Sequence, residues 1–406
     1  MKQKTIVILG GSFSGPAAAA KAREFDEKCR IILVEKGDTI NFSQSGLSYF
    51  LSGEVGSIED FKKERSEFFK SVYNIDIKTG TEATKIDPKK KEVQLKGKSE
   101  EVVKYDALIY ALGAESTLPD RLISRPSNLI FFRTPADLET IQKNLNNNKK
   151  KVAVIGSGPF GLEATDSLIR AGFEVALIEK RDSVFPAASR ISSRMIERDL
   201  NTKCKIYKSA EIAGFNISNN EIQSIQLKNG ESIAADFVIS TTGVKPNTKL
   251  LSSAGAKVTK DGALIVNSSA KTNLPEVYGC GACCAVSHVV SKKAEWMPQA
   301  AISDKLAQIA GANAMGSKLV LNQSVNSLLL RVGNLTYGRT GVSYTPNPKV
   351  CLTTVFAPAN ETFISGSKDI MIQVIWEKKS GVVIGAEIVG ESGVDKRLDV
   401  LAVAIA

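Results

Sequence analysis

The sequence predicts an α/β fold with two parallel-sheet domains and a third, α+β domain at the C-terminus. The same order of strand, glycine turn, helix and strand occurs twice, at residues 5–36 and 151–180. Later in the chain, each unit is followed by a buried strand that ends in glycine. From about Val325 the pattern changes to strands rich in β-branched and aromatic residues, and a helix follows them. The repeated unit is typical of Rossmann-like dinucleotide-binding domains.

The unit at residues 151–180 has the more complete glycine turn. Gly156 permits the tight turn, Gly158 lets backbone N–H groups approach a pyrophosphate, and Gly161 lets the helix pack closely against the strand. The positive N-terminus of that helix would face the phosphates. Glu179 ends the second strand, 23 residues after Gly156, where a carboxylate would accept hydrogen bonds from a ribose diol.

The unit at residues 5–36 repeats this order with one change. Glu35 ends its second strand, 25 residues after Gly10. Ser12 stands at the second glycine of the pattern, so a Cβ lies where a phosphate would come closest. Two such units in one chain predict two dinucleotides that pass electrons between them.

The remaining segments complete the predicted domains. Tyr105–Gly113 and Asp236–Gly243 are expected to be the buried strands that end the two sheets. Leu274–Cys284 reads as a further strand and turn, and Pro298–Met315 as a helix, so the first domain resumes after the second. The predicted domains are 1–115 with 248–324, 116–247, and 325–406.

Composition points to a soluble globular protein. The 406 residues are 43% apolar and 24% charged, and the net charge of +10 comes from scattered lysines. Scattered lysines indicate a solvated basic surface and no nucleic-acid groove. No run approaches the ~18 apolar residues that a bilayer span needs. A strand and a helix explain the N-terminal residues that imitate a secretion signal, so we expect a cytoplasmic protein.

Cysteine and histidine offer few candidates for chemistry. Cys280 and Cys283 have CxxC spacing and could form a redox dithiol, but small buried thiols in a tight turn are the alternative. No second cysteine pair exists, and the sole histidine, His288, is expected to be a structural residue at a helix end or in a loop. The sequence therefore predicts no metal site.

These segments together resemble the pyridine nucleotide-disulfide oxidoreductases, and most closely the coenzyme A-disulfide reductase and NADH oxidase branch. The resemblance is carried by the two glycine turns and by YDALIYALGA, ADFVISTTGVKPNT, TNLPEVYGCGACC and GVVIGAEIVGESGVDKRLDVLAVAI. The last segment is similar to the dimer-forming domain of that family. The resemblance therefore implies a homodimer that associates through residues 325–406.

The resemblance also implies FAD in the first domain and NADH or NADPH in the second. The implied FAD-binding residues are Gly10, Gly11, Ser12, Gly15, Glu35, Lys36, Ala83, Gly113, Gly281 and Ala282. The implied NAD(P)H-binding residues are Gly156, Gly158, Gly161, Glu163, Glu179 and Gly243. Glu179 favours NADH, whereas Lys180 and Arg181 could hold the 2′-phosphate of NADPH.

Several positions depart from the family pattern. Ser45 stands where that branch has its redox cysteine, and a serine forms no disulfide, persulfide or thiolate. We expect Ser45 to act as a hydrogen-bonding residue beside the flavin. Ala282 replaces an aspartate that holds the flavin ribityl chain, a loss of about 1.5–3 kcal/mol. Leu112 replaces a threonine near the flavin, so a weakened FAD site is expected.

Two main hypotheses of function follow. The first is an FAD-dependent NAD(P)H oxidoreductase without the redox cysteine, which passes hydride from nicotinamide to flavin and on to oxygen, another small molecule or a protein. The second is a non-catalytic family member that lost flavin chemistry and serves as a binding or structural protein. A third, weaker one makes Cys280 and Cys283 a relocated dithiol. The sequence leaves open the acceptor, the choice of NADH or NADPH, coenzyme A binding and whether the chain continues beyond Ala406.

Overall fold

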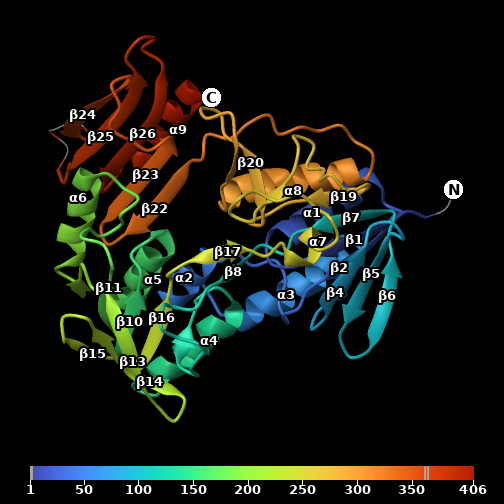
Figure 1. The fold of residues 1–406 in the computed structure, drawn as a ribbon, viewed down its shortest axis with the longest axis horizontal. Coiled ribbons are helices and arrows are strands. Elements are labelled where there is room, and N and C mark those ends of the chain that lie inside the picture. Colours follow the sequence, from blue (N-terminus) through green and yellow to red (C-terminus); the bar gives the residue numbers. More distant parts are fainter. Residues whose placement is uncertain (1–2, 361–362, 364) are drawn as a thin grey trace. The chain divides into compact units, whose positions relative to one another are not determined.

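The computed structural model describes residues 3–360, 363 and 365–406, without the side chains of residues 59, 60, 63 and 64. The chain forms two compact units (Figure 1). The first contains Met1–Ser43, Gly56–Glu115 and Val244–Ser324, and the second contains Gln44–Val55, Ser116–Gly243 and Val325–Ala406. Segment 44–55 thus groups with the second unit, although it falls inside the predicted range 1–115.

The first unit is built on a five-stranded parallel sheet with the order β19-β7-β1-β2-β3. Helices α1 and α8 pack against each other beside the sheet, and the antiparallel meander β4-β5-β6 is inserted between β3 and β7. The sheet strands are β1 (Thr5–Leu9), β2 (Arg30–Val34), β3 (Asp76–Lys78), β7 (Ala107–Tyr110) and β19 (Val277–Gly279). The other elements are α1 (Ser14–Phe25), α3 (Ile58–Ser71), β4 (Glu82–Asp87), β5 (Glu92–Lys96), β6 (Glu100–Lys104), β17 (Val244–Pro246), α7 (Lys249–Ser252), β18 (Leu264–Ile265), β20 (Cys284–Ser287), β21 (Ala294–Trp296) and α8 (Ala300–Ala314).

The second unit contains a parallel sheet of the same design, with the order β12-β11-β10-β16-β9. Its strands are β9 (Leu129–Ile130), β10 (Lys151–Ile155), β11 (Glu174–Ile178), β12 (Lys205–Tyr207) and β16 (Phe237–Ser240). Around them lie α2 (Gly46–Leu51), α4 (Pro135–Asn146), α5 (Pro159–Arg170), α6 (Arg190–Leu200) and the meander β13 (Ile212–Ser218), β14 (Glu221–Leu227) and β15 (Ser232–Ala234). β8 (Ala114–Ser116) spans the boundary between the units.

The two parallel sheets differ in where one of their edge strands comes from along the chain, namely β19 in the first unit and β9 in the second. In the first unit this strand, β19, comes late in the chain, whereas in the second unit β9 precedes all other strands of its sheet. The central strands β1, β7, β10 and β16 are almost wholly buried, as expected for parallel strands covered on both faces. The predicted strands ending in glycine, Tyr105–Gly113 and Asp236–Gly243, contain β7 and β16. The predicted α/β fold class is confirmed.

The C-terminal part of the second unit is an antiparallel sheet covered by one helix. The sheet has the order β22-β23-β26-β25-β24, and α9 packs on β23 and β26. Its elements are β22 (Leu328–Val332), β23 (Leu335–Gly341), β24 (Val350–Pro358), β25 (Asp369–Glu377), β26 (Val383–Gly390) and α9 (Val394–Ile405). This is the α+β arrangement predicted from Val325 onward.

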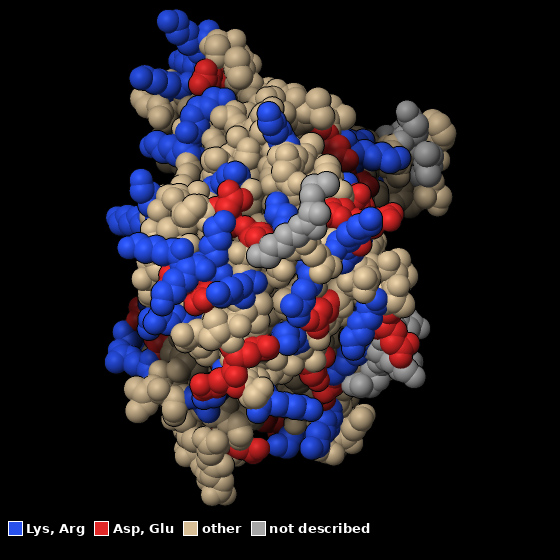
Figure 2. Space-filling view, turned by 90° about the vertical axis from the view of Figure 1, so that its right-hand side faces the viewer, with Lys and Arg blue, Asp and Glu red and all other residues tan. Residues whose placement is uncertain are grey.

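The surface carries basic and acidic side chains side by side. On the face drawn in Figure 2, lysine and arginine lie among aspartate and glutamate, as the scattered charges of the sequence suggest. Of the helices in the described part of the chain, none combines the length and apolar character that a membrane crossing requires.

A glycine contact fixes the packing of helix on strand in each unit. A Cβ on Gly15 would overlap the carbonyl oxygen of Gly10, and a Cβ on Gly161 would overlap that of Gly156. Gly10 and Gly156 have φ values of +106° and +99°, which side chains other than hydrogen rarely allow. By contrast, a Cβ on Gly158 would have no neighbour within 4 Å, and this residue has an ordinary φ of −68°.

We expect Gly161→Ala to destabilise the protein by about 1–3 kcal/mol, because the added methyl group forces α5 away from the glycine turn. Gly158→Ala is the matched control and should change the free energy of unfolding by less than about 0.5 kcal/mol. Urea unfolding of both variants, followed by circular dichroism, measures the difference. Equal stability of the two variants would contradict the packing argument.

Candidate functional site

The second unit contains a cavity of about 820 Å³ at the carboxyl ends of its parallel strands. It is lined by the glycine turn Gly156–Gly158, by the ends of β11 and β16, and by three loops. The lining residues of these loops are 117–121, 185–187 and 210–212. A crevice at this edge of an open parallel sheet is where such folds bind ligands.

The glycine turn leaves the N-terminus of α5 accessible to a ligand. Gly158 is the N-cap of α5, and no other atom would lie near a Cβ placed there. The first N–H groups of a helix lack partners within the helix, and they favour anions. Gly243 lies close by in the same unit, where its carbonyl accepts hydrogen bonds from the N–H and hydroxyl of Thr117 at 3.1 and 3.2 Å.

Glu179 is buried and braces the glycine turn. Its Oε2 accepts hydrogen bonds from the Ser157 N–H at 2.9 Å and from the Ser157 hydroxyl at 2.6 Å, while its Oε1 accepts one from the Arg181 N–H at 2.8 Å. The Ser157 hydroxyl also accepts from the Phe185 N–H at 3.0 Å. Glu179, the predicted ribose acceptor, thus stabilises the glycine turn through these hydrogen bonds.

Glu163 lies in the first turns of α5 in a desolvated environment. Burial raises the pKa of its carboxyl to about 7. A carboxyl group with this pKa can hold or release a proton near neutral pH. Among the predicted site residues of the second unit, Glu163 is the one suited to proton transfer.

The first unit repeats the carboxylate brace. Oε2 of Glu35 accepts a hydrogen bond from the Gly11 N–H at 2.6 Å, and its Oε1 accepts one from the Gly37 N–H at 2.7 Å. Ser12 follows in the turn and is half-buried. Lys36 points away from this brace and pairs with Glu82 at 2.9 Å, at the start of the strand that contains Ala83.

A second glycine-rich segment of the first unit follows β19. Gly281 has a φ of +82°, and a Cβ there would come within 2.9 Å of the Ser14 hydroxyl at the start of α1. The neighbouring carbonyl of Ala282 accepts a hydrogen bond from the Trp296 indole at 2.8 Å. Gly113, at the end of the β7 segment, also has a positive φ, of +62°. The glycine at position 281 thus makes room for Ser14, and the Ala282 side chain offers a ligand no hydrogen-bond acceptor.

The cysteines of this segment lie in the core. Cys280, Cys283 and Cys284 are buried, and the Cys283 and Cys284 sulfur atoms are 3.8 Å apart. Burial raises the pKa of Cys280 and Cys284 far above the usual thiol range. A hydrogen bond from Cys284 lowers the pKa of Cys283, and backbone N–H groups act in the same direction. The burial of all three fits small structural thiols.

The sole histidine is also buried. The His288 Nδ1 accepts hydrogen bonds from the N–H groups of Val290 and Ser291 at 3.1 and 3.4 Å, so it stabilises a turn. Across the residues with described side chains, His, Cys, Asp and Glu form no group of three that could hold a metal ion.

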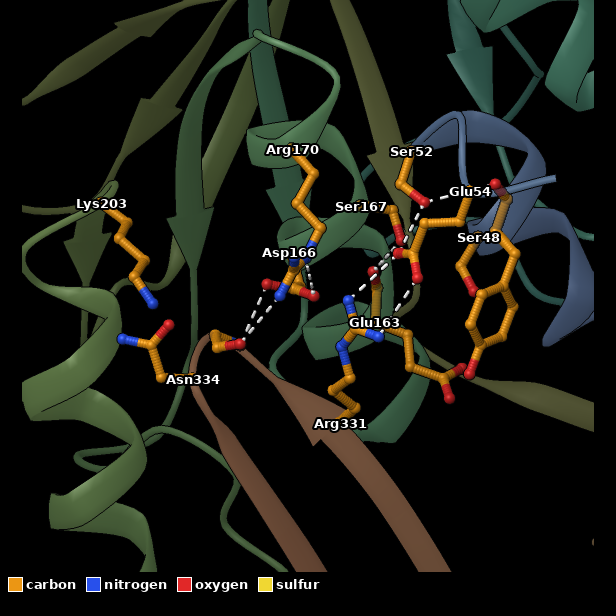
Figure 3. Close-up of polar contacts among 12 residues, drawn as sticks. Ser48, Ser52, Glu54, Glu163, Asp166, Ser167, Arg170, Lys203, Arg331 and Asn334 are labelled. Atoms are coloured by element: carbon orange, nitrogen blue, oxygen red, sulfur yellow. Dashed lines mark hydrogen bonds and ion pairs between the residues drawn. The ribbon is translucent and has the colours of Figure 1, made fainter. Parts of the chain in front are cut away.

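Ser45 directly precedes α2, in the second unit. Its carbonyl accepts a hydrogen bond from the Ser48 hydroxyl at 2.6 Å, and the residue is half-buried. Segment 44–55 is fixed at its far end by Glu54, which forms a two-point ion pair with Arg331 of β22 at 3.1 and 3.3 Å (Figure 3). The pair lowers the pKa of the Glu54 carboxyl, chiefly through these hydrogen bonds.

The tip of the β22–β23 hairpin is held by two aspartates. The carboxylate of Asp166 on α5 accepts from the Gly333 N–H at 3.0 Å and from Arg170 at 2.9 Å. That of Asp199 on α6 accepts from the backbone and side-chain N–H groups of Asn334 at 3.0 and 3.1 Å. Sequence reasoning missed Glu54, Arg331 and these aspartates. No local pattern could reveal partners as far apart as the 277 positions between Glu54 and Arg331.

The fold and these two glycine turns define a class of dinucleotide-dependent oxidoreductases. The chain belongs to the pyridine nucleotide-disulphide oxidoreductase family, whose sequence model matches residues 4–316. The predicted family is therefore confirmed.

Individual relatives lie in the predicted branch. The NADH oxidase of Methanocaldococcus jannaschii is 28% identical over 411 residues, which cover 98% of this chain and 90% of the relative. A coenzyme A disulfide reductase of Staphylococcus aureus is 28% identical over 421 residues, with 98% and 91% covered. The solved structure of a NAD-dependent persulfide reductase from A. fulgidus has a TM-score of 0.93 at 28% identity and covers 99% of this chain and 76% of its own.

The pKa of Glu163 predicts a pH-dependent stability. The unfolded chain releases this proton near the ordinary pKa of 4.5, and the folded protein near 7, so between these values the folded state binds more protons. Wild type should therefore lose stability relative to Glu163→Gln as the pH rises from about 4.5 to about 7. Thermal unfolding of both proteins from about pH 4 to 8 measures this difference. A constant difference in melting temperature would contradict the assignment.

Proposed function

We propose that this protein is an FAD-dependent NAD(P)H oxidoreductase of the NADH oxidase type that works without a redox cysteine. The observation that carries the proposal is the pair of equivalent glycine turns, each braced by a glutamate, in one chain of this family. Bound FAD would take up a hydride from the nicotinamide and pass electrons on to oxygen or to another small-molecule or protein acceptor.

The second unit supplies the NAD(P)H site in this proposal. The N-terminus of α5 and the turn Gly156–Gly158 would hold the pyrophosphate, since these turn residues line the cavity and the first N–H groups of a helix lack partners within it. Gly161 and Gly243 would shape the backbone around it, and Glu179 would keep the turn closed while its remaining acceptor positions serve a ribose. Glu163 lies on α5 outside the cavity lining, and its raised pKa would let it hold a proton near neutral pH.

The first unit supplies the FAD site. Gly10 and Gly11 would form its turn, which Glu35 braces, Gly15 would let α1 pack on that turn, and Gly113 and Gly281 would shape the backbone around the ligand. Ser12, Lys36, Ala83 and Ala282 complete the proposed set. Because Ala282 lacks a carboxylate, its position would hold the flavin less firmly by about 1.5–3 kcal/mol than an aspartate would.

Ser45 decides which acceptors the protein can use. A hydroxyl forms no mixed disulfide or persulfide, and Cys204, a cysteine of the same unit, has its pKa raised to about 11 by burial. Direct transfer to oxygen or another acceptor is therefore favoured over the disulfide and persulfide reduction named for the relatives. Ser45 would contribute a hydrogen bond and no nucleophile.

Association into a homodimer and a cytoplasmic location belong to the same proposal. The C-terminal helix α9 exposes Val400 and Val403 by 70% and 78%, and Phe356 on β24 is exposed by 60%. Large apolar side chains of this kind gain free energy when a second subunit covers them. Residues 325–406 would form the contact.

A non-catalytic role is the second candidate. It is favoured by the concentration of changes at the flavin site, where Ala282 and Leu112 replace polar side chains of the family pattern. Such a protein would keep the fold as a binding or structural module.

The visible absorption spectrum tests the proposal. The purified protein should show flavin bands, or gain them when FAD is added, and the bands should bleach when NADH or NADPH is added without oxygen. A colourless protein that FAD fails to reconstitute would contradict the oxidoreductase proposal and favour the non-catalytic candidate.

When FAD binding is titrated in this way, Ala282→Asp should bind FAD about tenfold to a hundredfold more tightly than wild type.

Ser45→Cys should add an activity that wild type lacks. The new thiol provides the missing nucleophile, so we expect NAD(P)H-dependent reduction of a small aliphatic disulfide by this variant and none by wild type or by Ser45→Ala. The rate of NAD(P)H oxidation with the disulfide under nitrogen measures it. Disulfide reduction by Ser45→Ala would show that Ser45 does not limit the choice of acceptor.

A further inference from the structure

The loop between β11 and α6 forms one wall of the cavity in the second unit. Phe185, Pro186 and Ala187 line the cavity there, and the Phe185 side chain is 1% exposed. Phe185 has a φ of +53°, in the left-handed region that a bulky side chain seldom adopts. A residue keeps such a conformation only where its surroundings enforce it, so the contacts of Phe185 decide where this wall lies.

The backbone of this loop is fastened to the glycine turn and to α6. The Phe185 N–H donates to the Ser157 hydroxyl at 3.0 Å, and the same hydroxyl donates to Glu179 at 2.6 Å. The Val184 carbonyl accepts from the Ser193 hydroxyl of α6, and both residues are buried. A displacement of Phe185 would therefore take a donor away from the hydroxyl that braces the glycine turn.

The side chain of Phe185 is held by the C-terminal sheet. Its ring meets the ring of Tyr337 on β23 edge to face, with the centroids 4.8 Å apart and the planes at 70°. Tyr337 is wholly buried, and its hydroxyl donates to the Glu387 carboxylate on β26 at 3.0 Å. Aromatic pairs favour this geometry, so the position of Tyr337 constrains that of Phe185.

Glu387 is a buried acid whose charge is met by neutral donors. It is 6% exposed, and it accepts the Ser189 N–H at 2.9 and 3.1 Å, the Ser192 hydroxyl and the Tyr337 hydroxyl. Ser189 is the N-cap of α6, where a negative charge is favoured. Because a buried carboxylate is stable only with well-placed donors, Glu387 fixes Tyr337 and the start of α6 relative to each other.

We propose that Tyr337 and Glu387 are positioning residues for the cavity, which hold its wall against the glycine turn through Phe185 and so raise the affinity for the dinucleotide. The residues of this network all belong to the second unit. The inference rests on the proposed NAD(P)H site and adds two residues of the C-terminal sheet that lie outside the cavity lining. Residues 325–406 would thus serve dinucleotide binding as well as the proposed contact between subunits.

Isothermal titration calorimetry with ADP-ribose tests this without flavin reduction or turnover. Tyr337→Leu removes both the ring and the hydroxyl, and it should bind ADP-ribose about tenfold more weakly than wild type. Tyr337→Phe keeps the ring against Phe185 and should lose only about twofold to fivefold. Glu387→Gln keeps one acceptor oxygen, so its loss should fall in the same smaller range. If Tyr337→Leu fails to fold, these two conservative variants decide the question.

Ile388→Ala is the matched control. Ile388 follows Glu387 on β26 and is wholly buried, but it packs in a hydrophobic cluster with Val394 and Leu398 of α9. The variant should lower the free energy of unfolding at least as much as Tyr337→Phe does, and leave the affinity for ADP-ribose unchanged. Urea unfolding followed by circular dichroism measures the stabilities, and the titrations are made where each variant is folded.

A double-mutant cycle shows whether Tyr337 acts through Phe185. Phe185→Ala should itself weaken binding, and adding Tyr337→Leu to it should cause little further loss. Losses that add in full would overturn the inference, as would unchanged affinity in the Tyr337 and Glu387 variants or an equal loss in Ile388→Ala. Wild type that does not bind ADP-ribose would overturn the proposed NAD(P)H site together with the inference.

Discussion

The close approach of a helix to a glycine turn is the contact on which both parallel-sheet parts depend. The carbonyl oxygens of Gly10 and Gly156 occupy the space that a Cβ on Gly15 or Gly161 would need. The first N–H groups of a helix lack partners within it and favour anions, so this packing places such groups at the end of a strand. In the second unit, the cavity is lined by this glycine turn.

Carboxylates serve this structure in three different ways. Glu35 and Glu179 accept backbone N–H groups and hold the glycine turns in shape. Glu387 is buried and accepts from the Ser189 N–H and the Tyr337 hydroxyl at 2.9 and 3.0 Å, which ties α6 to the C-terminal sheet. Glu163 lies in a desolvated place, where its pKa rises to about 7. Surroundings, and not residue type, assign these roles.

The C-terminal sheet also reaches the segment that carries Ser45. Its hairpin is fixed by Asp166 and Asp199, and Arg331 on the same hairpin binds Glu54 at the end of segment 44–55. The ion pair is exposed to solvent, so it adds little to the free energy of unfolding. The pair also links segment 44–55 to strand β22 of the same unit. In the proposed function, Ser45 would therefore depend on a strand that is far away in sequence.

The sequence by itself determined the repeated units, their glycine turns and the acids that end their second strands, since these features are local and follow strict spacing. It also predicted the family, which the match over residues 4–316 confirms. Only the tertiary structure decided that Glu179 turns toward Ser157, that Arg121 shares a cavity with Arg181, and that segment 44–55 groups with the second unit. Side-chain direction and contacts between distant segments arise from packing, which no local pattern records.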